Sequence, residues 1–179
     1  MNSEVFNNRF YAKQVDLANT VVKSLRKEGV PSYLFGGLAV DMVIGEKKFH
    51  KDIDIFIVGY GDEMIARTHN VLLGLGLRLI GEEFIGYNQL WKEVWVFEDE
   101  EHMIGVDVFY GSFADGHLLP IPIEYHESDP IIIDVPILIY TEMIGVSALK
   151  RVHVPSAQFK MERLKKLLSR LGIPSKLKL

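Results

Sequence analysis

The spacing of apolar residues predicts a helix near each end of the chain. Between residues 3 and 28, apolar side chains recur mostly every three or four positions, and Gly29 and Pro31 follow. This is the period of an amphipathic helix, closed by two residues that stop helices. A similar apolar stripe over residues 156–171 predicts the last helix. We expect the first helix to pack on a sheet.

Terminal signals predict two further helices in the interior of the chain. Asp62 is a suitable N-cap for a helix over residues 62–73, because its side chain can accept hydrogen bonds from free N–H groups of the first turn. Pro136 favours the start of a helix near residues 138–150, since proline is well tolerated in a first turn.

Runs of β-branched and aromatic residues predict the strands. Residues 89–97 and 102–110 are typical of an antiparallel hairpin joined by an acidic loop. Two shorter apolar runs, residues 33–35 and 52–58, predict buried strands. Weaker or mixed strand signals cover residues 77–85, 118–123 and 130–133.

Two glycines follow the first of these strands and precede a short helix over residues 38–44. Gly36 and Gly37 have no Cβ atoms, so a ligand can approach their backbone closely. The start of the following helix offers free N–H groups and the positive end of its dipole to an anion. The pattern therefore favours a phosphate-binding turn.

The next strand opens with a pair of carboxylates, Asp52 and Asp54. Residues two apart on a strand point to the same face, with Cα atoms roughly 6.5–7 Å apart. A third carboxylate, Asp107, lies in the middle of an otherwise apolar strand, where burial is costly without a partner or a metal. We therefore predict a metal site close to the glycine turn.

Gly-Gly, a short helix and Asp-Ile-Asp on a strand resemble the signature of the nucleotidyltransferase superfamily, the fold of DNA polymerase beta. The fuller pattern, GGLAVD at residues 36–41 and KFHKDID at residues 48–54, resembles the small lincosamide and aminoglycoside adenylyltransferases and the toxin-type enzymes. Two positions depart from it. Lys48 stands where these relatives commonly carry Arg, and Gly37 stands where many carry Ser.

The resemblance implies an α+β fold, in which helices and a short C-terminal helical segment pack on a mixed β-sheet. It also implies that Asp52, Asp54 and Asp107 hold two Mg²⁺ ions, and that Asp107 takes the proton of the acceptor hydroxyl. Gly36 and Gly37 would bind the β- and γ-phosphates of ATP or another nucleoside triphosphate through the backbone.

Three residues beside the paired acids are further candidates for nucleotide binding. Lys48 and Lys51 flank the site and can either contact phosphate or remain solvated, as loop lysines commonly are. His50 recurs beside the acids in the antibiotic-modifying relatives. Its side chain can contact a ligand or make a hydrogen bond that shapes the loop, and the sequence does not choose between these roles.

Composition limits the remaining possibilities. The 179 residues fit one domain, with a nucleotidyltransferase core over residues 1–135 and a helical segment over residues 136–179 packed on it. Absence of cysteine excludes disulfides and thiolate sites. The N-terminus lacks the apolar core of a signal peptide, so we expect a cytoplasmic protein without a membrane role.

Charge is distributed unevenly along the chain. Acids dominate residues 82–142, whereas residues 150–179 carry nine Lys or Arg and a single acid, Glu162. A basic end can meet a polyanion, but a solvated face of the last helix explains it equally simply.

The resemblance implies a Mg²⁺-dependent enzyme that moves a nucleoside monophosphate, with AMP from ATP as the first choice, and releases pyrophosphate. The acceptor can be a small hydroxylated molecule, a tRNA end or a protein side chain. An alternative is an interaction module that keeps the fold without turnover, such as one half of a toxin–antitoxin-like pair. The sequence leaves a homodimer or a protein partner open.

Overall fold

A computed structural model describes residues 3–85, 90–99, 102–111, 132–133, 135–150 and 153–174. Within these residues, five strands form one sheet in the order β1-β2-β5-β4-β3. The strands are β1 (Ser32–Phe35), β2 (Asp52–Val58), β3 (Arg78–Ile85), β4 (Leu90–Glu98) and β5 (Met103–Gly111). The helices are α1 (Ser3–Lys27), α2 (Gly36–Ile44), α3 (Asp62–Gly74), α4 (Val135–Lys150) and α5 (Val154–Arg170).

The sheet is mixed. β2 and β5 pair in parallel, whereas β1 with β2, β4 with β5 and β3 with β4 are antiparallel. The parallel register aligns Asp54 with Asp107, and the antiparallel register aligns Asp54 with Phe35, the last residue before the glycine turn. The expected α+β fold with a mixed sheet is therefore confirmed.

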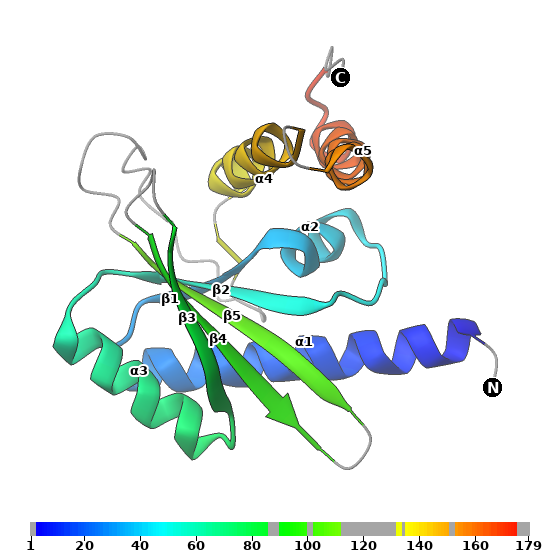
Figure 1. Cartoon of the computed structure of the whole chain (residues 1–179). Helices are drawn as coiled ribbons and strands as arrows, with labels where there is room; N and C mark the ends of the chain where they lie inside the picture. The colour runs from blue at the N-terminus through cyan, green and yellow to red at the C-terminus, as the bar shows by residue number, and fades with distance from the viewer. Residues whose placement is uncertain are drawn as a thin grey trace.

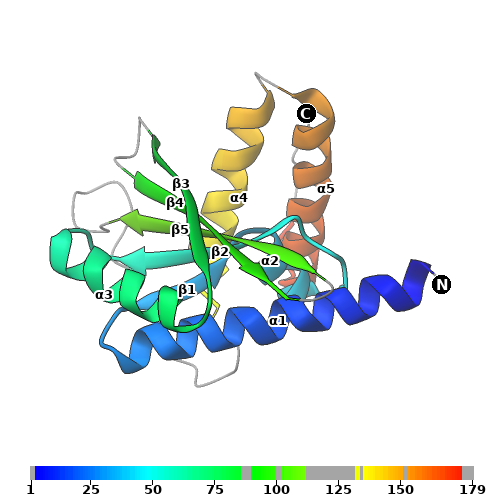
Figure 2. The same cartoon turned by 60° about the horizontal axis from the view of Figure 1, so that its bottom comes forward.

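Helices cover the two faces of the sheet differently. α1 and α3 lie against one face, and α2, α4 and α5 lie on the other, as Figures 1 and 2 show from two directions. Strand residues facing α1 and α3 are fully buried and apolar, among them Ile53, Ile55, Ile57, Val106 and Val108. The intervening positions carry the carboxylates, so we call the side of α2, α4 and α5 the site face.

Most predicted elements form where the sequence placed them, with small shifts at their ends. The expected N-cap of α3 is wrong by one residue, because Asp62 is the first helical residue and Gly61 precedes it without a side-chain cap. The mixed signal over residues 77–85 is strand β3, which carries an irregularity between Leu79 and Gly81.

The remaining predictions lie partly or wholly outside the described residues. The strand predicted over residues 118–123 lies there entirely. Of the strand predicted over residues 130–133, Ile132 forms an isolated parallel bridge with Leu34, and the Ile133 amide donates to the Leu34 carbonyl at 2.8 Å. The division of the chain at residue 135 stays a prediction. No helix in the described part of the chain is long and apolar enough to span a bilayer.

Candidate active site

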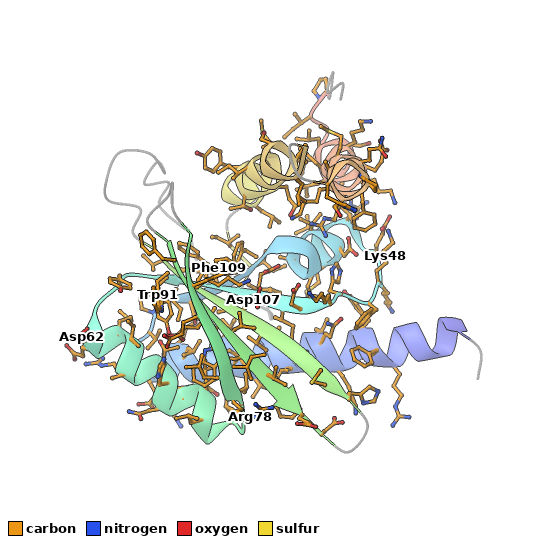
Figure 3. All side chains as sticks on the ribbon, viewed as in Figure 1. Lys48, Asp62, Arg78, Trp91, Asp107 and Phe109 are labelled. Atoms are coloured by element: carbon orange, nitrogen blue, oxygen red, sulfur yellow. The ribbon has the colours of Figure 1, made fainter. Side chains whose placement is uncertain are left out.

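Three carboxylates gather on the site face of the two central strands. Asp52 and Asp54 alternate with the buried Ile53, so both point to the same side of β2. Asp107 on β5 is the direct parallel partner of Asp54 and points the same way. We call Asp52, Asp54 and Asp107 the acid triad. Figure 3 shows Asp107 near the middle of the molecule, with Asp62 and Arg78 at its periphery.

The backbone of Gly36 lies directly against Asp54. A Cβ at Gly36 would be 2.0 Å from Asp54 Oδ2, and Gly36 has φ +68°, a conformation that L side chains rarely adopt. Gly36 is also the first residue of α2, whose N-cap, Phe35, contributes no side-chain cap. The amides at the start of α2 and a carboxylate of the acid triad therefore share one small space.

Gly37 is the point at which three segments meet. A Cβ there would lie 2.5 Å from Arg163 Nη1 and 2.7 Å from His50 Nδ1. Arg163 belongs to α5 and His50 to the loop before β2, so only glycine lets both side chains reach the start of α2. This cradle brings a guanidinium and an imidazole next to the amides that the sequence assigned to phosphate.

Electrostatic repulsion is strong at Asp54. Burial and, after it, the charges of Asp52, Asp107 and Glu142 together raise the pKa of its carboxyl to about 7, against the opposing charge of Lys160. A cation bound beside such an acid stabilises its ionised form, because the two charges attract. Hard divalent cations prefer such oxygen ligands, so the donor chemistry of the triad fits Mg²⁺.

Asp107 has a partner that the sequence analysis did not identify. Lys92 on β4 places Nζ 2.6 Å from Asp107 Oδ2 and 3.1 Å from Glu83 Oε1. Burial lowers the pKa of Lys92, but its hydrogen bonds to Asp107 and Glu83 outweigh burial, so the pKa is raised overall. Burial also raises the pKa of Asp107, and Lys92 opposes this effect.

The acid triad is aligned but not gathered into a finished cage. No group of three His, Asp or Glu side chains within the described residues lies close enough to hold a metal ion as it stands. Asp52 and Asp54 are in place on β2, whereas Asp107 is engaged by Lys92.

Helix α5 supplies two cations to the site that sequence reasoning missed. Arg163 forms a buried ion pair with Glu142 of α4, with Nη2 2.7 and 2.8 Å from the two carboxylate oxygens and Nε 3.1 Å from one of them. Its Nη1 faces Gly37 and is not one of the nitrogens that bind Glu142. Lys160 lies one turn earlier on α5, and its positive charge lowers the pKa of Asp54. The spacing of Lys160 and Arg163 was visible in the sequence, but nothing local indicated their target.

His50 is fixed from two sides. Its Nε2 lies 3.0 Å from Oδ2 of the buried Asp41, and its backbone exchanges two hydrogen bonds with the Gln14 side chain, at 2.6 and 3.0 Å. The loop-shaping hydrogen bond is therefore present, and Nδ1 remains directed to Gly37. Contact of His50 with a nucleotide stays a prediction.

The two predicted loop lysines lie at the edge of the site. Lys48 forms an ion pair with Glu46, which also binds Lys166 of α5 at 2.5 Å. The Lys48 side chain is 47% exposed, and Lys51 is exposed as well. Their contact with phosphate stays a prediction, since Lys48 is paired with Glu46 and Lys51 is exposed to solvent.

Comparison with known proteins bears on this geometry. The family described as nucleotidyl transferase of unknown function (DUF2204) matches residues 14–69, which include the glycine turn, Asp52 and Asp54. The crystal structure of ANT(2")-Ia in complex with adenylyl-2"-tobramycin superposes with a TM-score of 0.60 at 18% identity, over 89% of this chain and 90% of that one. The chain has the fold of the nucleotidyltransferase superfamily.

A solution structure of the antibiotic-resistance factor ANT(2'')-Ia agrees with this result. Its TM-score is 0.57 at 18% identity, over 90% of this chain and 92% of that one. Among curated proteins, no sequence matches this nucleotidyltransferase-fold chain. Fold and family match together support nucleotidyl transfer as the general chemistry.

Proposed function

We propose that this protein is a Mg²⁺-dependent nucleotidyltransferase that moves a nucleoside monophosphate from a nucleoside triphosphate to a hydroxyl acceptor. The observation that carries the proposal is the alignment of Asp54 with Asp107 on one sheet face, with Gly36 packed directly against the Asp54 carboxylate. Phosphate-binding amides and metal-binding oxygens then act on the same substrate.

Each part of the site has a defined task in this proposal. Asp52, Asp54 and Asp107 would hold Mg²⁺, and the metal would supply charge neutralisation for the triphosphate and for the attacking oxygen. The amides of Gly36 and Gly37 bind the β- and γ-phosphates. The acceptor oxygen bonds to the α-phosphorus, the bond from that phosphorus to the pyrophosphate oxygen breaks, and the acceptor proton passes to Asp107.

Helix α5 completes the phosphate side. Arg163 Nη1 and His50 Nδ1 both point to Gly37. Lys160, one turn before Arg163, lowers the pKa of Asp54 through its positive charge. A triphosphate placed at the glycine turn meets these groups at its outer phosphates, where pyrophosphate must be stabilised as it leaves. We therefore add Lys160 and Arg163 to the residues that bind the nucleotide.

We propose ATP as donor and a small hydroxylated molecule as acceptor. The support is the fold neighbour ANT(2")-Ia, whose complex contains tobramycin carrying an adenylyl group. This likeness concerns the fold at 18% identity, so other nucleoside triphosphates and larger acceptors, such as a tRNA end, belong in the same screen.

Calorimetric titration tests the proposal directly. A non-hydrolysable ATP analogue, with and without Mg²⁺, is titrated into the wild type, the Asp52→Asn/Asp54→Asn double variant and the control Asp62→Asn. Asp62 carries the same charge but lies at the start of α3, away from Asp107 (Figure 3). We expect Mg²⁺-dependent binding to the wild type and the control and none to the double variant.

The opposite result is equally clear. If the wild type binds no analogue of ATP, GTP, CTP or UTP, nucleotidyl transfer is overturned and the alternative of an interaction module gains, to be pursued by partner capture. If binding is found, pyrophosphate release in the presence of small hydroxyl compounds, and then of RNA, identifies the acceptor.

A further inference from the structure

Lys92 is the cation in contact with the acid triad. Among the described residues, no other Lys, Arg or His has a nitrogen within ion-pair distance of Asp52, Asp54 or Asp107. Lys92 lies on β4 opposite Phe109 of β5, and its Nζ is 5.5 Å from the centre of the Phe109 ring. Its side chain therefore reaches Asp107 diagonally, two residues from Phe109 on the neighbouring strand.

Burial distinguishes the two ion pairs that Lys92 makes. The side chains of Lys92 and Asp107 are 17% and 10% exposed, whereas Glu83 is 58% exposed. An exposed pair such as Lys92–Glu83 is screened by water and contributes little. The Lys92–Asp107 pair, which we call the inner pair, is shielded from water. Lys92 therefore interacts mainly with Asp107, and its contact with Glu83 contributes little.

The inner pair also leaves the two oxygens of Asp107 unequal. Lys92 Nζ lies 2.6 Å from Oδ2, and no other ion pair of Asp107 is formed among the described residues. While Lys92 stays in place, Asp107 can offer a single oxygen to the centre of the site. Asp52 and Asp54, on the side of the glycine turn, have no such restraint.

We propose that Lys92 is a positioning residue that divides the acid triad. By occupying Oδ2, it keeps Asp107 from binding a metal through both oxygens and holds Oδ1 towards the acceptor, so that Asp52 and Asp54 carry most of the metal binding. The part of this inference that concerns the acceptor rests on the proposed function. The part that concerns metal binding does not rest on the proposed function, because it follows from the charge of Lys92 alone.

Removal of Lys92 therefore has two effects of opposite sign. A divalent cation gains a more negative site and both oxygens of Asp107, so its affinity rises. Turnover falls, because Asp107 is no longer held for the acceptor. A residue that only supports the sheet would weaken both properties together, so this split identifies the positioning role.

The test uses Lys92→Met, which keeps the length and apolar stem of the side chain but removes its charge. Binding of Mn²⁺ to the nucleotide-free protein is measured by electron paramagnetic resonance of the free ion. We expect Lys92→Met to bind Mn²⁺ about three- to tenfold more tightly than the wild type. Lys92→Arg, which keeps the charge, and Glu83→Gln, which removes only the outer pair, should stay within about twofold.

Turnover is followed as pyrophosphate release at saturating nucleoside triphosphate and Mg²⁺. We expect kcat of Lys92→Met to fall by tenfold or more while KM for the nucleotide changes little, and we expect Lys92→Arg to recover part of kcat. Circular dichroism establishes that the variants are folded. If Lys92→Met does not fold, Lys92→Gln replaces it.

Four results decide the inference. Unchanged or weaker Mn²⁺ binding in the folded variant overturns it, as does an absence of Mn²⁺ binding in every variant including the wild type. Tighter Mn²⁺ binding with a wild type that turns over no nucleotide supports the control of the triad by Lys92 and overturns the proposed function alone. Tighter binding with reduced kcat supports both.

Discussion

At the scale of the residue, the candidate site costs the protein stability. Asp54 lies beside two other carboxylates, and burial raises its pKa from 3.8 to about 7. The folded state therefore binds this proton more tightly than the unfolded state does. Stability from this group is complete below about pH 4 and is lost as the pH rises through 7, where the folded protein must ionise the acid.

Asp54→Asn should consequently stabilise the metal-free protein, and more so as the pH rises. We expect little difference at pH 4 and a gain in the free energy of unfolding of roughly 1–3 kcal/mol at pH 8, somewhat below the full value of the pKa shift because water reaches part of the site. Urea denaturation with a chelator present measures it. Equal stability at pH 8 would show that Asp54 is not strained, and Asp62→Asn controls for net charge.

Gly36 offers a test in which backbone strain is matched. Gly36 and Gly45 have similar positive φ values, +68° and +77°, but a Cβ at Gly36 would meet Asp54 whereas a Cβ at Gly45 would meet nothing within 4 Å. Both alanine variants should lose about 1 kcal/mol through the backbone. Only Gly36→Ala should also abolish Mg²⁺-dependent nucleotide binding in calorimetry. If Gly36→Ala still binds the nucleotide, the glycine turn is not part of the nucleotide site.

At the scale of the element, Glu142 of α4 forms ion pairs with Arg163 and Lys160 of α5, and Arg163 also reaches the glycine turn. Glu142 is 1% and Arg163 8% exposed, and α5 reaches α2 through Arg163 at Gly37 and the loop after α2 through Lys166 at Glu46. A buried pair of this kind is costly to break from one side, because the longer contact with the 30% exposed Lys160, at 3.6 Å, replaces only part of the lost interaction of Glu142.

Arg163→Met should therefore lower the free energy of unfolding by about 3 kcal/mol. Glu142→Met/Arg163→Met should recover much of that loss, since it leaves no buried charge. Nucleotide affinity should not recover with stability, because Arg163 is absent from both variants. Urea denaturation and calorimetry on the same proteins measure the two quantities. A double variant that regains both would restrict Arg163 to a structural role.

The elements also show what the sequence could and could not predict. α2, β2 and β5 came from local signals, because a glycine pair, paired acids and strand alternation act over a few residues. Lys92, Lys160 and Arg163 were missed, because their significance depends on the sheet order and on a helix pair that returns to the site. Arg163 and Glu142 are 21 residues apart, and either would suit a solvated helix face. The position of Asp107 in an apolar strand predicted that it needs a partner, but the sequence did not identify Lys92 as that partner.

At the scale of the whole molecule, the proposed site joins segments that are far apart in the sequence. The glycine turn and the paired acids lie in the first third of the chain, Asp107 lies on β5, and Lys160 and Arg163 lie on α5. α3 lies on the opposite face of the sheet, where His69 and the buried Glu93 are 2.7 Å apart. A ligand at the site should therefore stabilise one face of the molecule more than the other.

Hydrogen exchange with and without a non-hydrolysable ATP analogue and Mg²⁺ tests this expectation. At a ligand concentration 100 times the Kd, the free energy of global unfolding should rise by about 2.7 kcal/mol. Local protection should appear at the start of α2 and along α5, but α3, which contacts no part of the site, should change only through global unfolding. Protection confined to α2 would exclude α5 from nucleotide binding. α2 and α5 meet through Gly37 and Arg163. If the ligand protects both helices in the wild type but only α2 in Arg163→Met, this contact is what transmits protection to α5.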